Sequence, residues 1–598
     1  MLNAATSEAH QEVWQNFRAG DYFRAFEGAI AALDVYPKDM SLKHMAVLCL
    51  ARGKAFAAAE ALFAKLNLAQ LHHEDILALS GKLAKSKLEE SAEAASSSDY
   101  INAAQLYEDV YDATQGSYSG VNAASLWFMA GDIEKAQALA KRLLKTPPPD
   151  APEPQEHYYF YATRGECFFI LADMKAAEEA LALALLADPD NYAARASTVK
   201  QFKMLNGGLL PDCAKLIKVQ PCLHYTGHLF HVCKPRPERS LTEAETETLA
   251  EDIKGLIADT PISAGFGALA AGADILFAEA ILEHGADLHL VLPVPVEDFR
   301  RLSVTPMGVY WEPRFDAVLT KATSIRIILD DPGDFDALDL KMGSLIAMGL
   351  ARLTAERLAA DTVQFSVMDK ASADLTSAGT RQDIQLWGEA GQKSVNIDWP
   401  HPFQAKVKAA LPASNDRQFK AMLFTDLKGY GKLPDRALPE IVTQIFEPMA
   451  AKCRALNIPP LQMKSWGDGL FLVFDTVMAA AEGALELMTC FEACAARFSA
   501  LHGADISLRI GVHFGPVWER PDPFTQAVNL YGRHVTTAAR LEALAIPGTI
   551  CVSENFAAML AMTSEAERAG IICDYVGRTK SDKEETLFSL YNLRKRPV

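Results

Sequence analysis

Apolar residues recur at helical spacing through the first two hundred positions of the chain, with small residues at the turns between them. AGDYFRAFEGAIAALDVYPKD from Ala19 and ARGKAFAAAEALFAKLNL from Ala51 place Gly20 and Gly53 33 residues apart. Such a period, with small residues at fixed offsets, is typical of helix pairs that stack in an array. The pattern predicts an N-terminal α-solenoid over residues 1–207, with an alanine-rich helical bundle as the alternative.

Beyond residue 207, short apolar runs alternate with helical ones. The runs HLFHVCK, HLVLPV, IRIIL and VQFSVMD predict strands, and ALAAGADILFAEAILEHG and GSLIAMGLARLTAERLAA predict helices. Alternation of strands with helices is typical of a parallel sheet covered on both faces. We therefore expect a central, Rossmann-like, doubly wound sheet over residues 222–400.

A glycine-rich turn inside this segment is a candidate ligand site. Gly265, Gly267 and Gly272 precede Asp274 at the start of a predicted helix. Glycines at such a turn let the backbone approach a phosphate at the helix N-terminus, and tight strand–helix packing is the alternative. GTRQDIQLW, which begins at Gly379, is expected to face the same crevice.

The last third of the chain, residues 415–598, predicts the order strand, helix, hairpin, helix, strand, helix, strand. FKAMLFTDLKGY predicts a strand that ends at Asp426, and LQMKSWGDGLFLVF predicts two strands that meet in a turn at Asp468. The whole chain is therefore expected to be a multidomain protein of class α + α/β with a C-terminal α+β domain.

The two aspartates, Asp426 and Asp468, are candidates for a metal site. Carboxylates at the ends of neighbouring strands converge, and hard ions such as Mg²⁺ or Mn²⁺ prefer oxygen ligands. The alternative is that each aspartate caps a turn, because aspartate is common where strands end.

Composition and charge disfavour nucleic-acid-binding, secreted and membrane-spanning proteins. The chain has 58 basic and 76 acidic residues, a net charge of −18, so general binding of nucleic acid is disfavoured. The N-terminus has no signal-peptide pattern, and apolar stretches are broken well short of a membrane span. The ten cysteines form no CxxC pair, which predicts reduced thiols. We expect a soluble, cytoplasmic protein that binds neither nucleic acid nor membrane.

Four blocks, FTDLKGYGKL, KSWGDGLFLVF, LRIGVHFGPV and YGRHVTTAARLEALAIPGTICVS, resemble the class III nucleotidyl cyclase catalytic domain in that order. The resemblance covers about residues 415–595 and implies a ferredoxin-like palm fold. It implies that Asp426 and Asp468 hold two divalent cations, Mg²⁺ or Mn²⁺, on a nucleoside triphosphate. The implied activity is that of a phosphorus–oxygen lyase that forms a 3′,5′-cyclic nucleotide and pyrophosphate. The related GGDEF domain is excluded, since its motif is absent.

The resemblance also assigns residues to the phosphates. Arg540, in TTAARLE, matches the arginine that stabilises charge in the transition state. Lys583 matches a lysine that contacts the triphosphate, with Lys580 as the competing choice. Thr536 stands where the family has an asparagine that orients the ribose, and loss of a positioned donor typically costs about 10²–10³ in rate.

The base-binding positions are implied in the same way. Lys464 matches the base-selecting lysine of adenylate cyclases, whose usual companion is aspartate or threonine. Asn529 stands at the companion position, and its amide offers both donors and acceptors. Adenine, and hence ATP, is the expected base, and guanine stays open.

Two weaker resemblances concern the other domains. The N-terminal segment resembles degenerate tetratricopeptide repeats over about residues 8–205. GADILFAEAILEHGADLHLVLP resembles the Rossmann-like superfamily of the LOG and DprA proteins, called SLOG domains, which implies a nucleotide-like ligand.

The leading hypothesis is an enzyme: a regulated class III cyclase that makes cAMP and works as a homodimer, because cyclase sites are shared between two catalytic domains. A protein partner is expected at the repeats. The alternatives are a catalytically weak cyclase-homology domain that senses nucleotides, and a scaffold built on the repeats.

Overall fold

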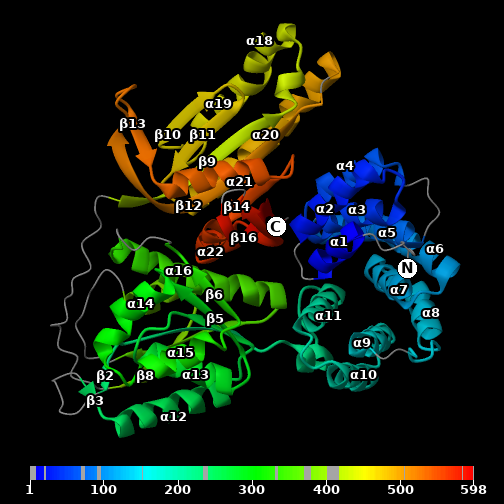
Figure 1. The fold of residues 1–598 in the computed structure, drawn as a ribbon. Coiled ribbons are helices and arrows are strands. Elements are labelled where there is room, and N and C mark those ends of the chain that lie inside the picture. The colour runs from blue at the N-terminus through cyan, green and yellow to red at the C-terminus, as the bar shows by residue number, and fades with distance from the viewer. Residues whose placement is uncertain are drawn as a thin grey trace.

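The computed structural model contains three bodies in chain order: a helical N-terminal array, a middle domain around a parallel sheet, and a C-terminal domain around a mixed sheet (Figure 1). The array lies beside the C-terminal end of the chain (Figure 1). The structure describes residues 8–18, 22–68, 74–90, 96–150, 153–232, 240–329, 335–368, 379–399, 417–503, 505–581 and 584–596. Within these ranges no helix is long and apolar enough to cross a bilayer.

The N-terminal array consists of antiparallel helix pairs, as the sequence predicts. Its helices are α1 (Glu8–Arg18), α2 (Tyr22–Val35), α3 (Met40–Arg52), α4 (Phe56–Lys65), α5 (Glu74–Glu90), α6 (Ser97–Thr114), α7 (Ser117–Ala130), α8 (Ile133–Leu143), α9 (Pro154–Ile170), α10 (Met174–Ala187) and α11 (Tyr192–Leu205). The side chains of Asp132, Asp173 and Asn191 accept hydrogen bonds from the third backbone N–H of α8, α10 and α11. These N-caps recur because each repeat starts a new helix at the same kind of turn.

The middle domain is a doubly wound sheet, as predicted. Its main strands are β1 (Cys222–Gly227), β4 (Ala264–Gly267), β5 (Asp287–Leu292), β6 (Ser324–Ile327), β7 (Thr362–Met368) and β8 (Ser394–Asp398), all parallel, in the order β6-β5-β4-β1-β7-β8. The helices are α12 (Glu243–Asp259), α13 (Ala273–Glu283), α14 (Val296–Ser303), α15 (Glu312–Leu319), α16 (Ala337–Leu358) and α17 (Thr380–Glu389).

Two details of the middle domain correct the sequence analysis. The main-sheet strand at its start is CLHYTG, residues 222–227. The described part of the predicted strand HLFHVCK, residues 228–232, holds the short β2 (His231–Val232), which pairs with β3 (Ser240–Leu241) and not with the main sheet. Both segments alternate, but only CLHYTG is buried along nearly its whole length, as a central parallel strand requires. The helix expected from Ala268 begins five residues later, at Ala273.

The C-terminal domain contains the predicted strands and helices plus several that were not expected. Its sheet follows the order β10-β11-β9-β12-β14-β16-β15, with β13 paired to β12. The strands are β9 (Arg417–Lys428), β10 (Gln462–Trp466), β11 (Gly469–Phe474), β12 (Ser507–Pro521), β13 (Val528–Tyr531), β14 (Ile550–Ser553), β15 (Ile571–Ser581) and β16 (Glu584–Lys595). The helices are α18 (Leu438–Ile441), α19 (Glu447–Arg454), α20 (Val477–His502), α21 (Arg533–Leu544), α22 (Glu554–Ala561) and α23 (Ser564–Arg568).

The strand that carries Asp426 is longer than predicted. It continues two residues beyond Asp426, to Lys428, because the antiparallel neighbour β12 pairs with it along its whole length. Asp426 therefore lies inside a ladder, opposite Arg509, and not at a strand end.

The middle and C-terminal domains share a close interface. Helix α16 crosses α22 so closely that a Cβ on Gly349 would lie 2.2 Å from the Ala558 carbonyl oxygen. At the N-terminus of α16, Asp336 and Asp339 form ion pairs with Arg417, and all three side chains are buried. Arg417 begins β9, so this buried cluster ties the middle domain to the strand that carries Asp426.

Candidate active site

Asp426 and Asp468 come from neighbouring strands of the C-terminal sheet. Asp426 belongs to β9, and Asp468 lies in the turn between β10 and β11. The register pairs Thr425 of β9 with Leu470 of β11, so Asp426 lies level with the turn that carries Asp468. The glycine before Asp468, Gly467, has φ +61°, which suits the tight turn of a two-residue hairpin.

A third carboxylate, Glu542, and an arginine, Arg509, join this end of the sheet. Arg509 of β12 forms an ion pair with Asp426, and its Nε lies 3.2 Å from Glu542 Oε1. Burial raises the pKa of Glu542 to about 7; Arg509 opposes the rise, and the charges of Asp426 and Asp468 add to it. Three acidic side chains therefore lie near one another at this end of the sheet, and Arg509 is paired with two of them, Asp426 and Glu542.

Helix α21 brings the remaining phosphate and ribose candidates to the sheet. It lies directly on β12, where a Cβ on Gly511 would stand 2.2 Å from the Glu542 backbone nitrogen. Glycine at this position is what allows helix and strand to approach so closely. Thr536 and Arg540 lie four residues apart on α21 and so share one side of the helix.

A cavity of about 300 Å³ is lined by residues of β9, β10 and β11, the strands that also carry or flank Asp426 and Asp468. Its lining residues are Phe424, Lys464, Phe471, Asp522, Thr525, Asn529, Leu530 and Val535. The rings of Phe424 and Phe471 are neighbours, with centroids 4.5 Å apart. Apolar walls with a few polar groups are typical of a small-molecule site, and the volume is at the lower end of that class.

Hydrogen bonds connect the polar groups of this cavity. Lys464 Nζ donates to Asn529 Oδ1 at 2.6 Å, and the backbone N–H of Leu530 donates to the same oxygen at 3.0 Å. Asn529 Nδ2 donates to Asp522 Oδ2 at 3.1 Å. The structure thus brings together the two predicted base-binding residues and adds Asp522, whose pKa is lowered first by the backbone N–H groups of Thr525 and Phe524.

The residues at the carboxylate end fit divalent cations. Asp426 and Asp468 offer oxygen ligands where negative charge accumulates, and Mg²⁺ is typically held by one or two carboxylates plus substrate phosphates. Within the described ranges, no group of three or more His, Cys, Asp or Glu side chains is arranged to hold a metal ion. A cation at Asp426 and Asp468 would therefore need substrate phosphates or water as its further ligands. An incoming cation would compete with Arg509 for Asp426.

The sequence analysis offers two lysines as contacts for the triphosphate, Lys583 and Lys580. Lys583 falls outside the described residues. Lys580, the competing choice, belongs to strand β15 and pairs with Leu587.

The predicted ligand glycines of the middle domain are closely packed. A Cβ on Gly265 would lie 2.4 Å from Ile281, one on Gly267 would lie 2.6 Å from the Tyr225 ring, and one on Gly272 would lie 2.6 Å from a backbone carbonyl oxygen. These contacts favour the packing alternative for all three glycines.

Asp274, the fourth predicted residue of that site, is a buried acid at the start of α13. It accepts a 3.3 Å hydrogen bond from the Ala270 backbone N–H. Burial raises its pKa to about 7, and the charge of Asp383 contributes. Asp383, from the GTRQDIQLW segment, accepts a 2.8 Å hydrogen bond from Thr226. The two predicted segments of the crevice therefore meet through a pair of buried acids.

Three residues of the candidate active site escaped the sequence analysis: Arg509, Glu542 and Asp522. The first two lie inside the quoted blocks LRIGVHFGPV and TTAARLE, and a charged residue among apolar neighbours in these blocks was the available signal. Asp522 lies in the loop RPDPFTQ, where an Asp before a proline indicates only a turn.

Two segments of the chain match known protein families. Residues 414–587 match the model of the adenylate and guanylate cyclase catalytic domain. The C-terminal domain is a class III cyclase domain. Residues 21–127 match the model described as Tetratricopeptide Repeats-Sensor, in agreement with the helical array. The kinship of the middle domain with SLOG proteins stays a prediction.

Individual cyclases are similar to part of this chain. An adenylate cyclase of Podospora anserina is 26% identical over an alignment of 180 residues, which covers 26% of this chain and 8% of that protein. The chain thus spans less than a tenth of that curated relative. The solved adenylyl cyclase CyaB from P. aeruginosa is 18% identical with a TM-score of 0.26, covering 30% of this chain and 95% of its own. The guanylyl cyclase Cya2 is 17% identical with a TM-score of 0.26, covering 30% and 94%.

Proposed function

We propose that the protein is a class III nucleotidyl cyclase that converts a nucleoside triphosphate, ATP first among them, into a 3′,5′-cyclic nucleotide and pyrophosphate. The ribose 3′-oxygen bonds to the α-phosphorus, the bond from that phosphorus to the pyrophosphate oxygen breaks, and the hydroxyl proton is lost to solvent. The cyclase family match supports the reaction class.

One observation supports the proposal most directly: the cavity that holds Lys464 and Asn529 is lined by the same strands that carry or flank Asp426 and Asp468. Phe424 lines the cavity, and Asp426 follows two residues later on the same face of β9. Lys464 lines the cavity, and Asp468 follows four residues later in the same hairpin. A base in the cavity therefore leaves its phosphates within reach of the carboxylates.

The chain's own residues divide into two groups in this proposal. Lys464, Asn529 and Asp522 bind the base through their hydrogen-bond network. Arg540 faces the phosphates from α21, and Arg509 is a second guanidinium at that end of the site. Two divalent cations, Mg²⁺ or Mn²⁺, when bound at Asp426 and Asp468, supply charge stabilisation at the phosphates. Lys583 remains a predicted triphosphate contact.

Thr536 motivates the alternative function, a nucleotide sensor with little or no turnover. Its side chain is exposed on α21 in place of the family asparagine. A threonine hydroxyl is shorter than an amide and offers one donor where the amide offers two. The proposal of an active enzyme therefore includes slow turnover.

The helical repeats and the middle domain would regulate the cyclase domain. We propose a homodimer through the cyclase domain, a protein partner at the repeats, and a nucleotide-like ligand in the middle domain. The buried ion pairs between Arg417 and α16 support a mechanical link from the middle domain to β9. A location in the cytoplasm stays a prediction from composition.

The test offers the purified full-length protein ATP, GTP, CTP and UTP separately, with Mg²⁺ and then Mn²⁺, and identifies products by mass spectrometry. Binding of each nucleotide is measured in parallel by fluorescence competition. A cyclic product from one nucleotide supports the enzyme and names its base. Binding of a nucleotide with no product from any of the four favours the sensor.

A further inference from the structure

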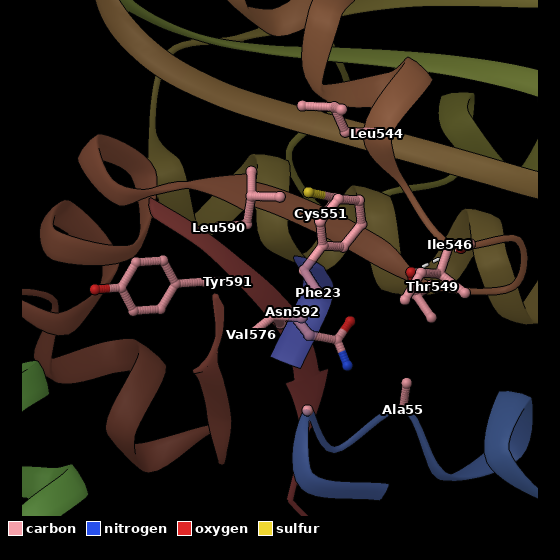
Figure 2. Close-up of a pocket in the computed structure, with 11 residues that line it drawn as sticks. Phe23, Ala55, Leu544, Ile546, Thr549, Cys551, Val576, Leu590, Tyr591 and Asn592 are labelled. Atoms are coloured by element: carbon pink, nitrogen blue, oxygen red, sulfur yellow. Dashed lines mark hydrogen bonds between the residues drawn. The ribbon is translucent and has the colours of Figure 1, made fainter. Parts of the chain in front are cut away.

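One side chain of the first helical repeat is buried in the cyclase domain. Phe23 of α2 is 4% exposed, and the other buried members of its apolar cluster all come from the cyclase domain. They are Leu541, Ala545, Cys551 and Leu590, with Leu544, Ile546 and Val576 at the edge. Figure 2 shows the Phe23 ring directed toward Cys551, with Leu544 and Leu590 nearby. The burial of Phe23 is therefore an interdomain contact.

This contact is tightly packed. The cavity left between the repeat and the cyclase domain measures about 20 Å³, room for about one water molecule (Figure 2). Beside it, a Cβ on Gly53 would lie 3.4 Å from Val576, and Asn592 donates a 3.4 Å hydrogen bond to the Lys54 carbonyl oxygen. Close-packed surfaces transmit displacement instead of absorbing it.

The cluster reaches the helix that carries candidate active-site residues. Leu541, which is fully buried, stands in the chain between Arg540 and Glu542. The same turn of α21 lies directly on the sheet, where a Cβ on Gly511 of β12 would stand 2.2 Å from the Glu542 backbone nitrogen and 2.7 Å from the Leu541 carbonyl carbon. Helix α21 thus packs on its own sheet, and Phe23 of the repeat domain completes the apolar cluster that α21 forms with Cys551 of β14 and Leu590 of β16.

We propose that Phe23 is a positioning residue for the cyclase site, through which the repeat domain sets the placement of α21. It touches neither substrate nor reacting atoms and acts by packing alone. This inference rests on the proposed function for its effect on turnover and deepens it by naming the contact through which the repeats regulate the site. A partner that pulls α2 away from the cyclase domain would lower turnover.

The test compares full-length Phe23→Ala and Phe23→Leu with a matched control, Phe169→Ala. Phe169 is a buried phenylalanine of α9 whose cluster includes no cyclase residue. Hydrogen–deuterium exchange of residues 533–545 reports the placement of α21 without any need for turnover. Steady-state kinetics with ATP and Mn²⁺ separate kcat from KM.

We expect faster exchange in residues 533–545 and a kcat lower by about 10-fold in Phe23→Ala, since small misplacements of catalytic groups are costly. KM should change by less than about threefold, because the hydrogen-bonding groups expected to bind the base, Lys464 and Asn529, belong to β10 and β13 and not to α21. Phe23→Leu should restore most of both values, and Phe169→Ala should leave both unchanged.

Unchanged exchange in Phe23→Ala would overturn the inference, as would an equal effect of Phe169→Ala, which would indicate general loosening of the repeats. Absence of product from the wild-type protein would overturn the proposed function instead. In that case the exchange data still decide whether Phe23 positions α21.

Discussion

Lys464 and Asn529, 65 residues apart in the chain, are joined by a 2.6 Å hydrogen bond inside the candidate base pocket. Because Asn529 Oδ1 also accepts the Leu530 N–H, its acceptor capacity is used within the protein. The Asp522 carboxylate, which accepts from Asn529 Nδ2, then becomes the acceptor offered to a base, with Lys464 as the donor. We expect this donor and acceptor to meet the ring nitrogen and amino group of adenine; guanine would need the same two roles in the reverse order.

Asp522→Ala is expected to reduce the preference for ATP over GTP by about 10-fold, because a charge-assisted hydrogen bond to the adenine amino group is lost. Fluorescence competition with ATP and GTP measures the ratio, independent of turnover. Asp435→Ala removes an exposed aspartate outside the pocket lining and serves as the matched control. An unchanged ratio in Asp522→Ala would show that the carboxylate does not read the base.

Thr536→Asn restores the side chain that the cyclase family has at this position. We expect kcat to rise by about 100-fold, since a positioned donor to the reacting region is typically worth two to three orders of magnitude. Product formation from ATP with Mn²⁺ is the measurement, with Thr537→Asn, the next residue of α21, as the control. A kcat that stays at the wild-type value would mean that Thr536 already performs the role or that the site does not turn over.

Arg417→Ala is expected to destabilise the joint between the middle and cyclase domains by about 3–5 kcal/mol, because Asp336 and Asp339 would remain buried without their cation. Urea unfolding followed by the exchange of β9 and α16 measures the loss. Arg568→Ala, at an exposed arginine of α23, should change stability by less than about 0.5 kcal/mol. Equal stabilities of the two variants would contradict the role of this ion cluster.

The buried carboxyl of Asp274 should make the free energy of unfolding depend on pH. Its folded pKa of about 7 exceeds the ordinary 3.8, so the folded state binds the proton more tightly. Its contribution is complete below about pH 4 and is lost as the pH rises to about 7, a loss on the order of 4 kcal/mol.

The neutral variant Asp274→Asn should therefore be more stable than wild type at pH 8 and about equal at pH 4. Denaturant midpoints across this range test the expectation, and Asp259→Asn, at an exposed position of α12, is the control. Parallel curves for Asp274→Asn and wild type would mean that Asp274 is ionised in the folded protein at neutral pH.

The sequence predicted elements more reliably than contacts. Period and turn chemistry identified the helical array, and apolar runs with intervening turns identified β9, the β10–β11 hairpin and α16. The strand HLFHVCK was placed wrongly because alternation alone does not distinguish a central strand from an edge segment. Burial, which decides between them, depends on the rest of the sheet.

The contacts between distant residues were beyond prediction for a physical reason. Arg509 meets Asp426 because of the register of β12 on β9, and Phe23 meets the Leu541 cluster because two domains dock. Neither register nor docking leaves a periodic trace in one chain. Lys464 and Asn529 were paired only through the resemblance to cyclases, and Asp522 had no motif to mark it.

The most direct test of the account measures cyclic nucleotide formation from ATP and Mn²⁺ by the full-length protein beside Asp426→Ala and Asp468→Ala. Circular dichroism verifies that both variants remain folded, and ATP binding without product verifies an intact base pocket. We predict cAMP from the wild-type protein and none from either variant. The proposed cyclase mechanism would be contradicted if a folded Asp426→Ala or Asp468→Ala protein formed product at the wild-type rate. It would also be contradicted if the wild-type protein bound ATP and formed no product.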